Sequence, residues 1–293
     1  MPFKWVNNIL IIDKRGYMKI AIVSHITLDT IDNQDSYHLG GSACYCGLIC
    51  KELGFETILV TKVGEDLPQD KRDFLKRNLV DIKQFEKECL TTKFSIRQHN
   101  NDDTREMTLL SKCNPLTVDD VSDIDADGWI ISPVIDEVPL NVLTAITKKG
   151  KFVLLDPQGY LRKVQPSGTI SLAKNVTLDW SGVSAVKADE DEFKILGPIN
   201  TDFVISTTRR VIHINEHKLR LDYIPTIDAT GIGDILSAVF TCIYIREKDS
   251  RLAICNAAGA ITAALKANAK GLDKIPTKSK IQEYSANFSK MYI

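Results

Sequence analysis

The chain has 293 residues, with 37 Lys and Arg against 38 Asp and Glu and a formal net charge of -1. Hydrophobic residues make up 44% and charged residues 26%, the composition of an ordinary globular protein. The balanced charge gives no bulk field that would recruit nucleic acid or an anionic membrane surface. The length suits one α/β domain with an appendage.

The predicted elements begin with residues 18–24, a continuous apolar run typical of a strand that is buried on both faces of a parallel sheet. Small and apolar residues at helical spacing predict a helix over 42–53 that ends at Gly54. Residues 57–61 return to strand character. The order strand, helix, strand indicates a parallel pair of strands.

A charged helix is expected over 70–78, and a Thr-rich stretch with polar alternation predicts a hairpin over 91–110. We assign this hairpin to a small β lid formed by about residues 30–39 and 87–110. The lid would close over a bound small molecule and exclude water from it. Pairing of the lid with a second subunit, as a homodimer, stays open.

Four more buried strands are expected, over 128–132, 152–156, 182–187 and 203–206, with helices over 139–149 and 191–196 between them. A second hairpin should span 211–221, with its turn at Asn215 and Glu216. Two apolar helices, over 233–245 and 250–265, should pack face to face. The repeated strand and helix units predict a parallel sheet covered by helices on both faces.

Seven cysteines, an odd number, follow no recognisable secretion signal, which predicts reduced thiols in a cytoplasmic protein. The longest mostly apolar stretch, residues 252–265, is interrupted by Asn256 and is shorter than the ~20 residues that cross a bilayer. We therefore expect no membrane span. Residues 1–17 are expected to be an N-terminal extension and residues 18–293 the folded domain.

The strongest chemical signal is DATGIGD at 228–234, which follows a turn at Pro225 and directly precedes an apolar helix. Gly231 and Gly233 allow backbone amides to point into one concavity, and the helix adds the positive end of its dipole. Such a segment can hold the charge that develops on a transferring phosphoryl group. Asp234 could then accept the proton of an attacking hydroxyl, although a helix cap is the alternative reading.

A glycine pair, Gly40-Gly41, opens the helix SACYCGLI near the front of the chain. It would permit close approach of a ligand to the backbone, and a simple hinge would use the same residues. Together with DATGIGD, this pair resembles the two signatures of the ribokinase-like carbohydrate kinase family, which includes the phosphofructokinase-B type enzymes. Four segments lie between them in family order: VGED at 63–66, TTKFS at 91–95, LLDPQGYLR at 154–162 and VKADEDE at 186–192.

The resemblance covers most of the chain and implies a three-layer α/β/α fold with a mainly parallel central sheet and a small β lid. It implies an ATP-dependent kinase that uses Mg²⁺ and phosphorylates a hydroxyl of a small sugar or polyol, a phosphotransferase with an alcohol acceptor. Asp234 resembles the catalytic base of the family. The anion-hole segment of the family is matched by Thr230, Gly231, Ile232 and Gly233.

The resemblance also implies a substrate pocket. Its expected members are Asp29, Gly40, Gly41, Tyr45 and Arg162. Asp29 matches the carboxylate that holds substrate hydroxyls, for which two oxygens suit two adjacent hydroxyls; a solvated loop Asp is its alternative. Tyr45 stands where the family has Asn, which puts ribose itself in doubt. Arg162 could pair with substrate or phosphate through its planar fork.

On the donor side, the resemblance implies nucleotide contacts from Lys187, Asp189, Thr207, Asn256 and Gly259. Glu192 would reach Mg²⁺ through water, and Asp189 replaces the Asn usual in that motif. A plain acidic helix start would explain both acids, and tight packing of small residues would explain Gly259. The stretch VISTTRR lacks the glycines usual in the nucleotide-binding loop, so the phosphate donor and the roles of Arg209 and Arg210 stay open.

Two other clusters carry no predicted site. Cys44, Cys46 and Cys50 do not give a closed tetrahedral set on a helix and are expected to be buried small residues. His213 and His217 flank a hairpin turn and lack a nearby third ligand. Two alternatives to a sugar kinase remain: a nucleoside kinase in which Tyr45 stacks on a base, and a non-catalytic small-molecule sensor that keeps the fold.

Overall fold

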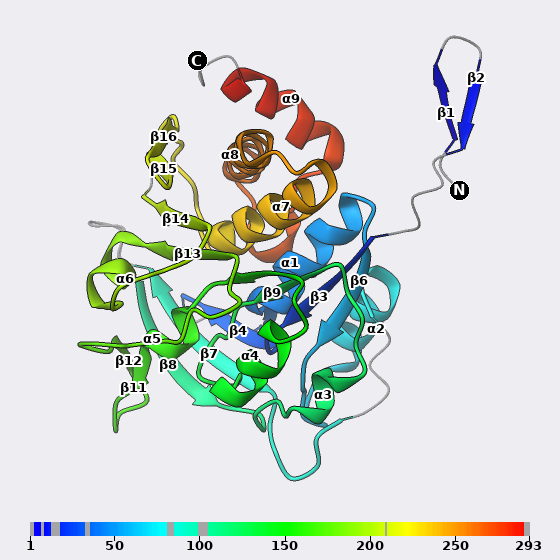
Figure 1. Cartoon of the computed structure of the whole chain (residues 1–293). Helices are drawn as coiled ribbons and strands as arrows, with labels where there is room; N and C mark the ends of the chain where they lie inside the picture. The colour runs from blue at the N-terminus through cyan, green and yellow to red at the C-terminus, as the bar shows by residue number, and fades with distance from the viewer. Residues whose placement is uncertain are drawn as a thin grey trace.

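The computed structural model describes residues 3–6, 9–12, 18–32, 36–80, 85–98, 105–208 and 210–289 (Figure 1). Outside this range lie residues 1–2, 7–8, 13–17, 33–35, 81–84, 99–104, 209 and 290–293, of which 33–35 and 99–104 belong to the predicted lid. β1 (Phe3–Val6) and β2 (Ile9–Ile12) form an antiparallel pair of their own. The boundary of the extension stays a prediction.

The central sheet, among the described residues, has eight strands in the order β16-β15-β14-β13-β10-β9-β3-β6. Six strands run parallel: β3 (Lys19–Val23), β6 (Glu56–Val60), β9 (Gly128–Ile131), β10 (Phe152–Leu155), β13 (Ala185–Asp189) and β14 (Phe203–Thr207). β15 (Val211–Ile214) and β16 (His217–Arg220) extend one edge antiparallel. The mainly parallel sheet follows from the apolar runs of the sequence.

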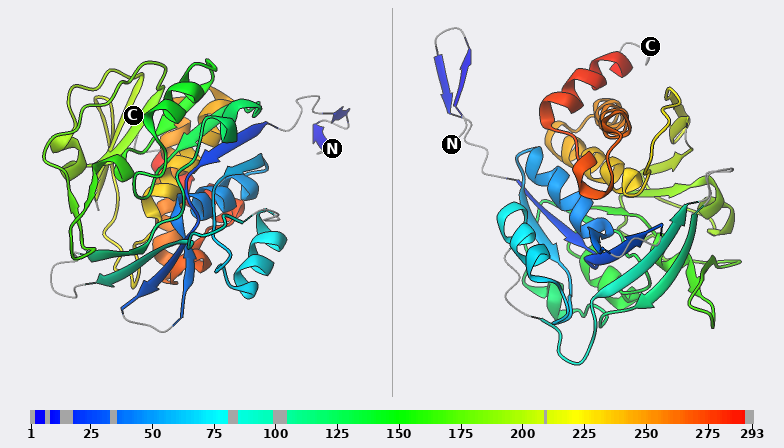
Figure 2. Two further views of the ribbon diagram at one scale, coloured as in Figure 1. Left: turned by 90° about the horizontal axis from the view of Figure 1, so that it is seen from below. Right: turned by 180° about the vertical axis from the view of Figure 1, so that it is seen from behind.

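Helices cover both faces of this sheet (Figures 1 and 2). One face packs on α1 (Gly41–Glu52), α7 (Ile232–Glu247), α8 (Ser250–Ala267) and α9 (Lys278–Ser289). The other face packs on α3 (Asp119–Ser122) and α4 (Leu140–Thr147). Alternate residues of one strand serve the two cores, as Ile20 and Ala21 show. The three-layer α/β/α fold is therefore confirmed.

A second sheet, with strand order β5-β4-β7-β8, is formed by the segments assigned to the lid, whose role as a lid stays a prediction. Its strands are β4 (Thr27–Ile31), β5 (His38–Gly40), β7 (Thr92–Gln98) and β8 (Arg105–Ser111). The predicted hairpin over 91–110 corresponds to β7 and β8, and β4 begins three residues before the predicted lid. Because β4 follows β3 after three residues, the lid joins the central sheet directly (Figure 2).

The predicted strand over 182–187 begins late, because Gly182 has φ +77 in a turn and β13 starts only at Ala185. α2 (Gln69–Asn78) and α6 (Glu190–Ile195) lie within two residues of their predicted bounds. Eight described elements were not predicted: β1, β2, α3, α5 (Gln158–Leu161), β11 (Arg162–Val164), β12 (Ile170–Leu172), the short helix η1 (Gly271–Lys274) and α9. Over the described residues, no helix has both the length and the apolar character of a membrane span.

Candidate active site

The N-termini of α1 and α7 meet at one point of the fold. The Ser42 hydroxyl, in the first turn of α1, donates to Asp234 Oδ1 over 2.5 Å, and the Cys46 thiol one turn later lies 3.4 Å from the Asp234 carbonyl oxygen. Asp234 is itself in the first turn of α7. Two helix N-termini, each with a positive dipole end, therefore adjoin one carboxylate and the glycine-rich segment before it.

The glycines of the DATGIGD segment are required by close neighbours. Gly231 is the N-cap of α7, has φ +78 and lies against the ring of Tyr45, so that a side chain there would collide with the ring. A methyl group at Gly233 would lie 2.5 Å from Lys187 Nζ. The ammonium of Lys187 therefore sits directly beside the backbone of the predicted anion hole, which adds a full positive charge to the helix dipole.

Lys187 holds this place through a buried ion pair. Its Nζ lies 2.8 Å from Oδ2 of Asp156, whose side chain is fully buried. Burial lowers the pKa of Lys187, but the carboxylates of Asp156 and Glu192 outweigh burial, so the pKa is raised and the ammonium stays charged. The predicted donor-side residue Lys187 thus lies beside the predicted anion hole, in the middle of β13 and next to the start of α7.

Asp234 has the character of a proton acceptor. Burial raises the pKa of its carboxyl group above the ordinary value, and the nearby charge of Asp156 raises it further. The Ser42 hydroxyl and the cations Lys187 and Arg162 act in the opposite direction without cancelling the shift. A carboxylate with a raised pKa binds a proton more tightly and so serves better as a general base near neutral pH.

A chain of polar side chains runs outward from Asp234. The Ser42 and Ser132 hydroxyls are 2.7 Å apart, and Gln158 Nε2 lies 3.4 Å from Ser42 Oγ and 3.3 Å from Ser132 Oγ. Arg162 then donates to Gln158 Oε1 over 2.7 Å and to the Val134 carbonyl oxygen over 2.7 Å. Arg162 therefore lies in the site, but it reaches Asp234 through Gln158 and the two serines.

Asp29 on β4 lies close to the glycine pair Gly40-Gly41, where β5 ends and α1 begins. A side chain at Gly40 would collide with Oδ2 of Asp29, and one at Gly41, which has φ +80, would collide with the backbone carbonyl oxygen of His25. Neither position has room for a side chain. Asp29 thus lies beside the residue that precedes α1, and Asp234 accepts from Ser42 in its first turn, so both carboxylates adjoin one helix start.

Tyr45 is 2% exposed, with its ring against Gly231. Burial raises the pKa of its hydroxyl, and the carboxylates of Asp228, Asp29 and Asp234 add to the shift. The expected substrate residue Tyr45 thus packs under the anion-hole segment, and its hydroxyl lies within the field of three carboxylates.

The start of the anion-hole segment is tied down by a lysine that sequence reasoning missed. Lys274, at the end of η1 and 1% exposed, donates to the carbonyl oxygens of Asp228 and Thr230 over 2.7 and 3.0 Å. Its Nζ is also 2.7 Å from Asp228 Oδ2. Burial raises the pKa of Asp228, but Lys274 and the backbone amides of Gly271 and Thr230 lower it to a net value below the ordinary one.

The acidic start of α6 is a capping box. Asp189 Oδ1 accepts from the backbone amides of Asp191 and Glu192, and Glu192 Oε2 accepts from the amide of Asp189. Capping of α6 therefore explains both acidic residues without a ligand, and these hydrogen bonds occupy one oxygen of each carboxylate. In the described part of the chain, no group of three acidic, His or Cys side chains could hold a metal ion.

The other residues predicted to contact the phosphate donor lie in different surroundings. Thr207 pairs with Asp189 across β13 and β14, so these two belong to one edge. Gly259 faces the backbone of Ser285 and Ile281, so the packing of α8 on α9 accounts for it. Asn256 donates to the Leu252 carbonyl within its own helix over 2.8 Å. Arg210 lies over the ring of Tyr223, and Arg209 lies outside the described residues.

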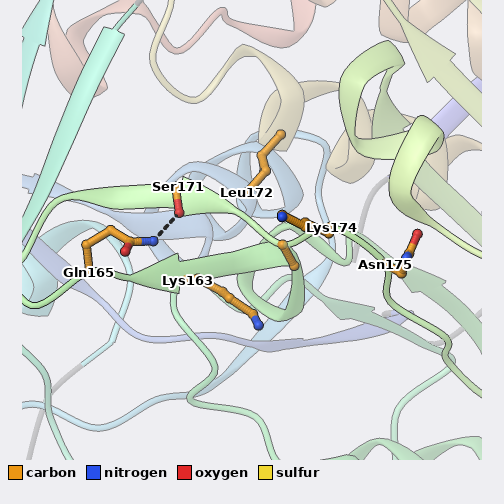
Figure 3. A pocket seen from close by; sticks show the side chains of 7 residues that line it. Lys163, Gln165, Ser171, Leu172, Lys174 and Asn175 are labelled. Atoms are coloured by element: carbon orange, nitrogen blue, oxygen red, sulfur yellow. Dashed lines mark hydrogen bonds between the residues drawn. The ribbon is translucent and has the colours of Figure 1, made fainter.

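A cavity of about 430 Å³ lies beside the β11-β12 hairpin (Figure 3). It is lined by Lys163, Gln165, Ser171, Leu172, Ala173, Lys174 and Asn175. The Gln165 side chain donates to Ser171 across the hairpin over 2.6 Å. None of the predicted site residues lines this cavity, so we do not connect it with the site at Asp234.

No protein-family model and no curated protein matches this sequence. Solved structures do match. A pyrophosphate-dependent kinase in the ribokinase family, complexed with a pyrophosphate analog and myo-inositol, superposes with a TM-score of 0.72 at 20% identity, over 90% of this chain and 99% of that chain. The nucleoside kinase of Methanocaldococcus jannaschii gives 0.68 at 22%, over 93% and 100%.

The ribokinase of Cryptococcus neoformans in complex with ADP gives a TM-score of 0.69 at 14% identity, over 91% of this chain and 99% of that chain. Nearly the whole length of each of these proteins is matched. Identities of this size establish common architecture. The chain has the ribokinase fold.

Proposed function

We propose that the protein is a kinase that transfers a phosphoryl group to a hydroxyl group of a small sugar or polyol, with Asp234 as the general base. The observation that carries the proposal is the position of Asp234. It lies in the first turn of α7, directly after a glycine-rich N-terminus, with a raised pKa and the Ser42 hydroxyl 2.5 Å from Oδ1. A base beside an anion-binding backbone is what phosphoryl transfer to an alcohol needs.

Each part of the reaction has a group in this chain. Asp29 would hold substrate hydroxyls, with Gly40 and Gly41 leaving the backbone open beside it. Asp234 would take the proton of the attacking hydroxyl at a carboxylate oxygen. The backbone amides from Thr230 to Asp234 and the ammonium of Lys187 would stabilise the negative charge on the transferred group. Lid strand β4 carries Asp29, so substrate binding would draw the lid toward the central sheet.

The donor is proposed to be a phosphoanhydride, with ATP as the first candidate. ATP is favoured by the ADP complex of a protein with this fold. Pyrophosphate is the second candidate, because the matched kinase complexed with a pyrophosphate analog has the higher TM-score. The packing of α9 over Gly259 also accounts for that glycine without a nucleotide contact.

Mg²⁺ would be held chiefly by donor phosphates and water, because the carboxylates of this site are already engaged. Asp156 is paired with Lys187, and Asp189 and Glu192 cap α6. Glu192 would therefore reach the ion through water, and this fits the preference of Mg²⁺ for retaining part of its hydration shell. When bound, the ion supplies charge neutralisation to the phosphates.

The acceptor is proposed to be a sugar or cyclitol. The myo-inositol complex of a similar fold favours a cyclitol, and the nucleoside kinase match keeps nucleosides as the alternative. Tyr45 packs under Gly231 and would not be free to stack on a base, which favours the smaller polyol. A cytoplasmic location and a homodimer through the lid stay predictions.

The experiment is a matrix of donors against acceptors. The purified protein is incubated with Mg²⁺ and either ATP or pyrophosphate, with ribose, other sugars, myo-inositol and nucleosides as acceptors, and phosphate esters are detected by ³¹P NMR. We expect one acceptor class to be phosphorylated, and Asp234→Asn to abolish the signal. If no pair reacts, calorimetric titration with a non-hydrolysable ATP analogue and with a pyrophosphate analogue decides the matter. Absence of binding would favour the non-catalytic sensor.

A further inference from the structure

Two cysteines meet where the lid hairpin joins the body of the protein. Cys89 lies three residues before β7, and Cys113 lies two residues after β8. Their sulfur atoms are 3.0 Å apart. The two chain segments already run side by side there, because the Ser111 hydroxyl donates to the Thr91 carbonyl oxygen over 2.6 Å. The pair therefore closes the open end of the hairpin at its root.

The two thiols differ in how easily a reagent can reach them. Cys89 is half-buried and lies between two exposed residues, Glu88 and Leu90. Leu90 is 52% exposed. Cys113 is 2% exposed, and burial together with its hydrogen bond to Cys89 raises its pKa to about 12. Cys89 is thus the sulfur that meets small molecules from solvent, and Cys113 is the partner held behind it.

We propose that Cys89 and Cys113 are an exchangeable dithiol that reacts with low-molecular-weight disulfides to form a reversible disulfide across the lid root. The Cys89 thiolate attacks one sulfur of the small disulfide, which forms a mixed disulfide and releases one small thiol. Cys113 then loses its proton and attacks the sulfur of Cys89, which releases the second small thiol. The two protein thiols are oxidised, and the small disulfide is reduced to two thiols.

Little movement is needed for this bond. A disulfide has a length of about 2.05 Å, so the sulfurs must approach by roughly 1 Å, within the reach of side-chain rotation on a half-exposed loop. The bond would close a loop between positions 24 apart in the sequence. Closing a loop of this length restricts the unfolded chain and should raise the melting temperature by about 5 °C for a domain of this size.

A second close pair in the same chain provides an internal comparison. Cys50 and Cys242 lie 3.4 Å apart between α1 and α7, and both are fully buried. Burial, together with the Cys242 thiol beside it, raises the pKa of Cys50 well above its ordinary value. Proximity is similar in the two pairs but access is not, so oxidation should distinguish them. The remaining cysteines Cys44, Cys46 and Cys255 are buried as well.

The test treats the folded full-length protein with oxidised glutathione and counts free thiols after denaturation in acid. We expect the count to fall from seven to five, with peptide mapping under non-reducing conditions joining Cys89 to Cys113. The melting temperature should rise by about 5 °C and return on addition of dithiothreitol. Cys89→Ser and Cys113→Ser should each lose this response, whereas Cys50→Ser should keep it.

Three results would overturn the proposal. The first is a count that stays at seven, and the second is a disulfide that maps to other cysteines. The third is a stable mixed disulfide on Cys89 with Cys113 still reduced. Because the readouts are thiol count and mapping, they do not depend on whether the protein phosphorylates any tested acceptor.

Discussion

Asp234→Asn is the substitution that tests the site most directly. Asn has nearly the shape of Asp, and its amide oxygen can still accept the Ser42 hydroxyl that now lies 2.5 Å from Oδ1. The glycines and amides of the anion hole are left in place. The change therefore removes the proton acceptor and one negative charge, with little change in packing.

The expected loss of turnover follows from the value of general base catalysis. A positioned base contributes roughly 10²- to 10⁴-fold, so kcat should fall by at least about 100-fold, which is ~2.7 kcal/mol at ~1.36 kcal/mol per factor of ten. KM for the acceptor should change much less, since Asp29 would hold the substrate. The assay is steady-state kinetics with whichever donor and acceptor pair the screen identifies.

The same substitution should stabilise the fold at neutral pH. Burial and Asp156 raise the pKa of Asp234, so its charged form is less favourable in the folded protein than in the unfolded chain. The penalty is absent when the pH lies below the pKa that Asp234 has in the unfolded chain. It grows as the pH rises from that value to the pKa in the folded protein, and it is complete above the folded pKa. The gain in Asp234→Asn should therefore be seen at pH 7 and vanish near pH 3.

The expected rise in melting temperature follows from the entropy of unfolding. About 270 folded residues at ~2.1 cal/mol/K each give ~0.6 kcal/mol/K, so removal of ~1 kcal/mol of charge penalty raises the melting temperature by about 2 °C. Asp70→Asn, on the surface of α2, is the matched control: turnover should be unchanged, and the melting temperature should not rise, because Lys71 and the helix start favour the charged form of Asp70. Turnover near the wild-type value, or a lower melting temperature at pH 7, would refute the role given to Asp234.

Three further substitutions test the surroundings of the base. Ser42→Ala removes the hydroxyl that lowers the pKa of Asp234, so the acid limb of the pH-rate profile should move to higher pH and kcat should fall about tenfold. Lys274→Met leaves the buried carboxylate of Asp228 without its ammonium partner, so the free energy of unfolding should fall by about 3–5 kcal/mol. In urea unfolding this is seen as a lower midpoint with an unchanged slope. Gly231→Ala strains a φ of +78 and collides with the Tyr45 ring, so both kcat and the melting temperature should fall; unchanged kinetics would show that this backbone is not part of the anion hole.

The buried strands of the central sheet could be predicted from the sequence, whereas short elements at the surface could not. Continuous apolar runs predicted β3, β9, β10 and β14, because a strand buried on both faces needs apolar residues at every position. The β11-β12 hairpin was missed because it is short and carries exposed Val164 and Leu172 beside polar residues. The start of the lid was placed late because β4 mixes polar residues with apolar ones.

The candidate site divides in the same way. The glycine-rich signature pointed to Asp234, Gly231 and Gly233, since Gly231 has φ +78 against the Tyr45 ring and Gly233 lies close to Lys187 Nζ. Ser132, Gln158 and Lys274 are common residues with no local pattern, and only the tertiary fold brings them to the site. Gly259 was assigned to the nucleotide, although a glycine inside a helix of small residues equally serves close packing, and the contact with α9 explains it.

The carboxylates Asp156 and Asp234 raise the question of which one acts as the base, and their partners answer it. Asp156 is fully buried, with Oδ2 on the ammonium of Lys187 and Oδ1 accepting from the backbone amide of Gln158, so both of its oxygens are engaged and neither is open to a substrate hydroxyl. The hydrogen bonds from Ser42 and Ser132 both end on Oδ1 of Asp234, which leaves Oδ2 for a substrate hydroxyl. Because Asp156 also raises the pKa of Asp234, replacing Lys187 by Met should strengthen that repulsion and shift the acid limb upward. A limb that does not move would mean that the proton acceptor is another group.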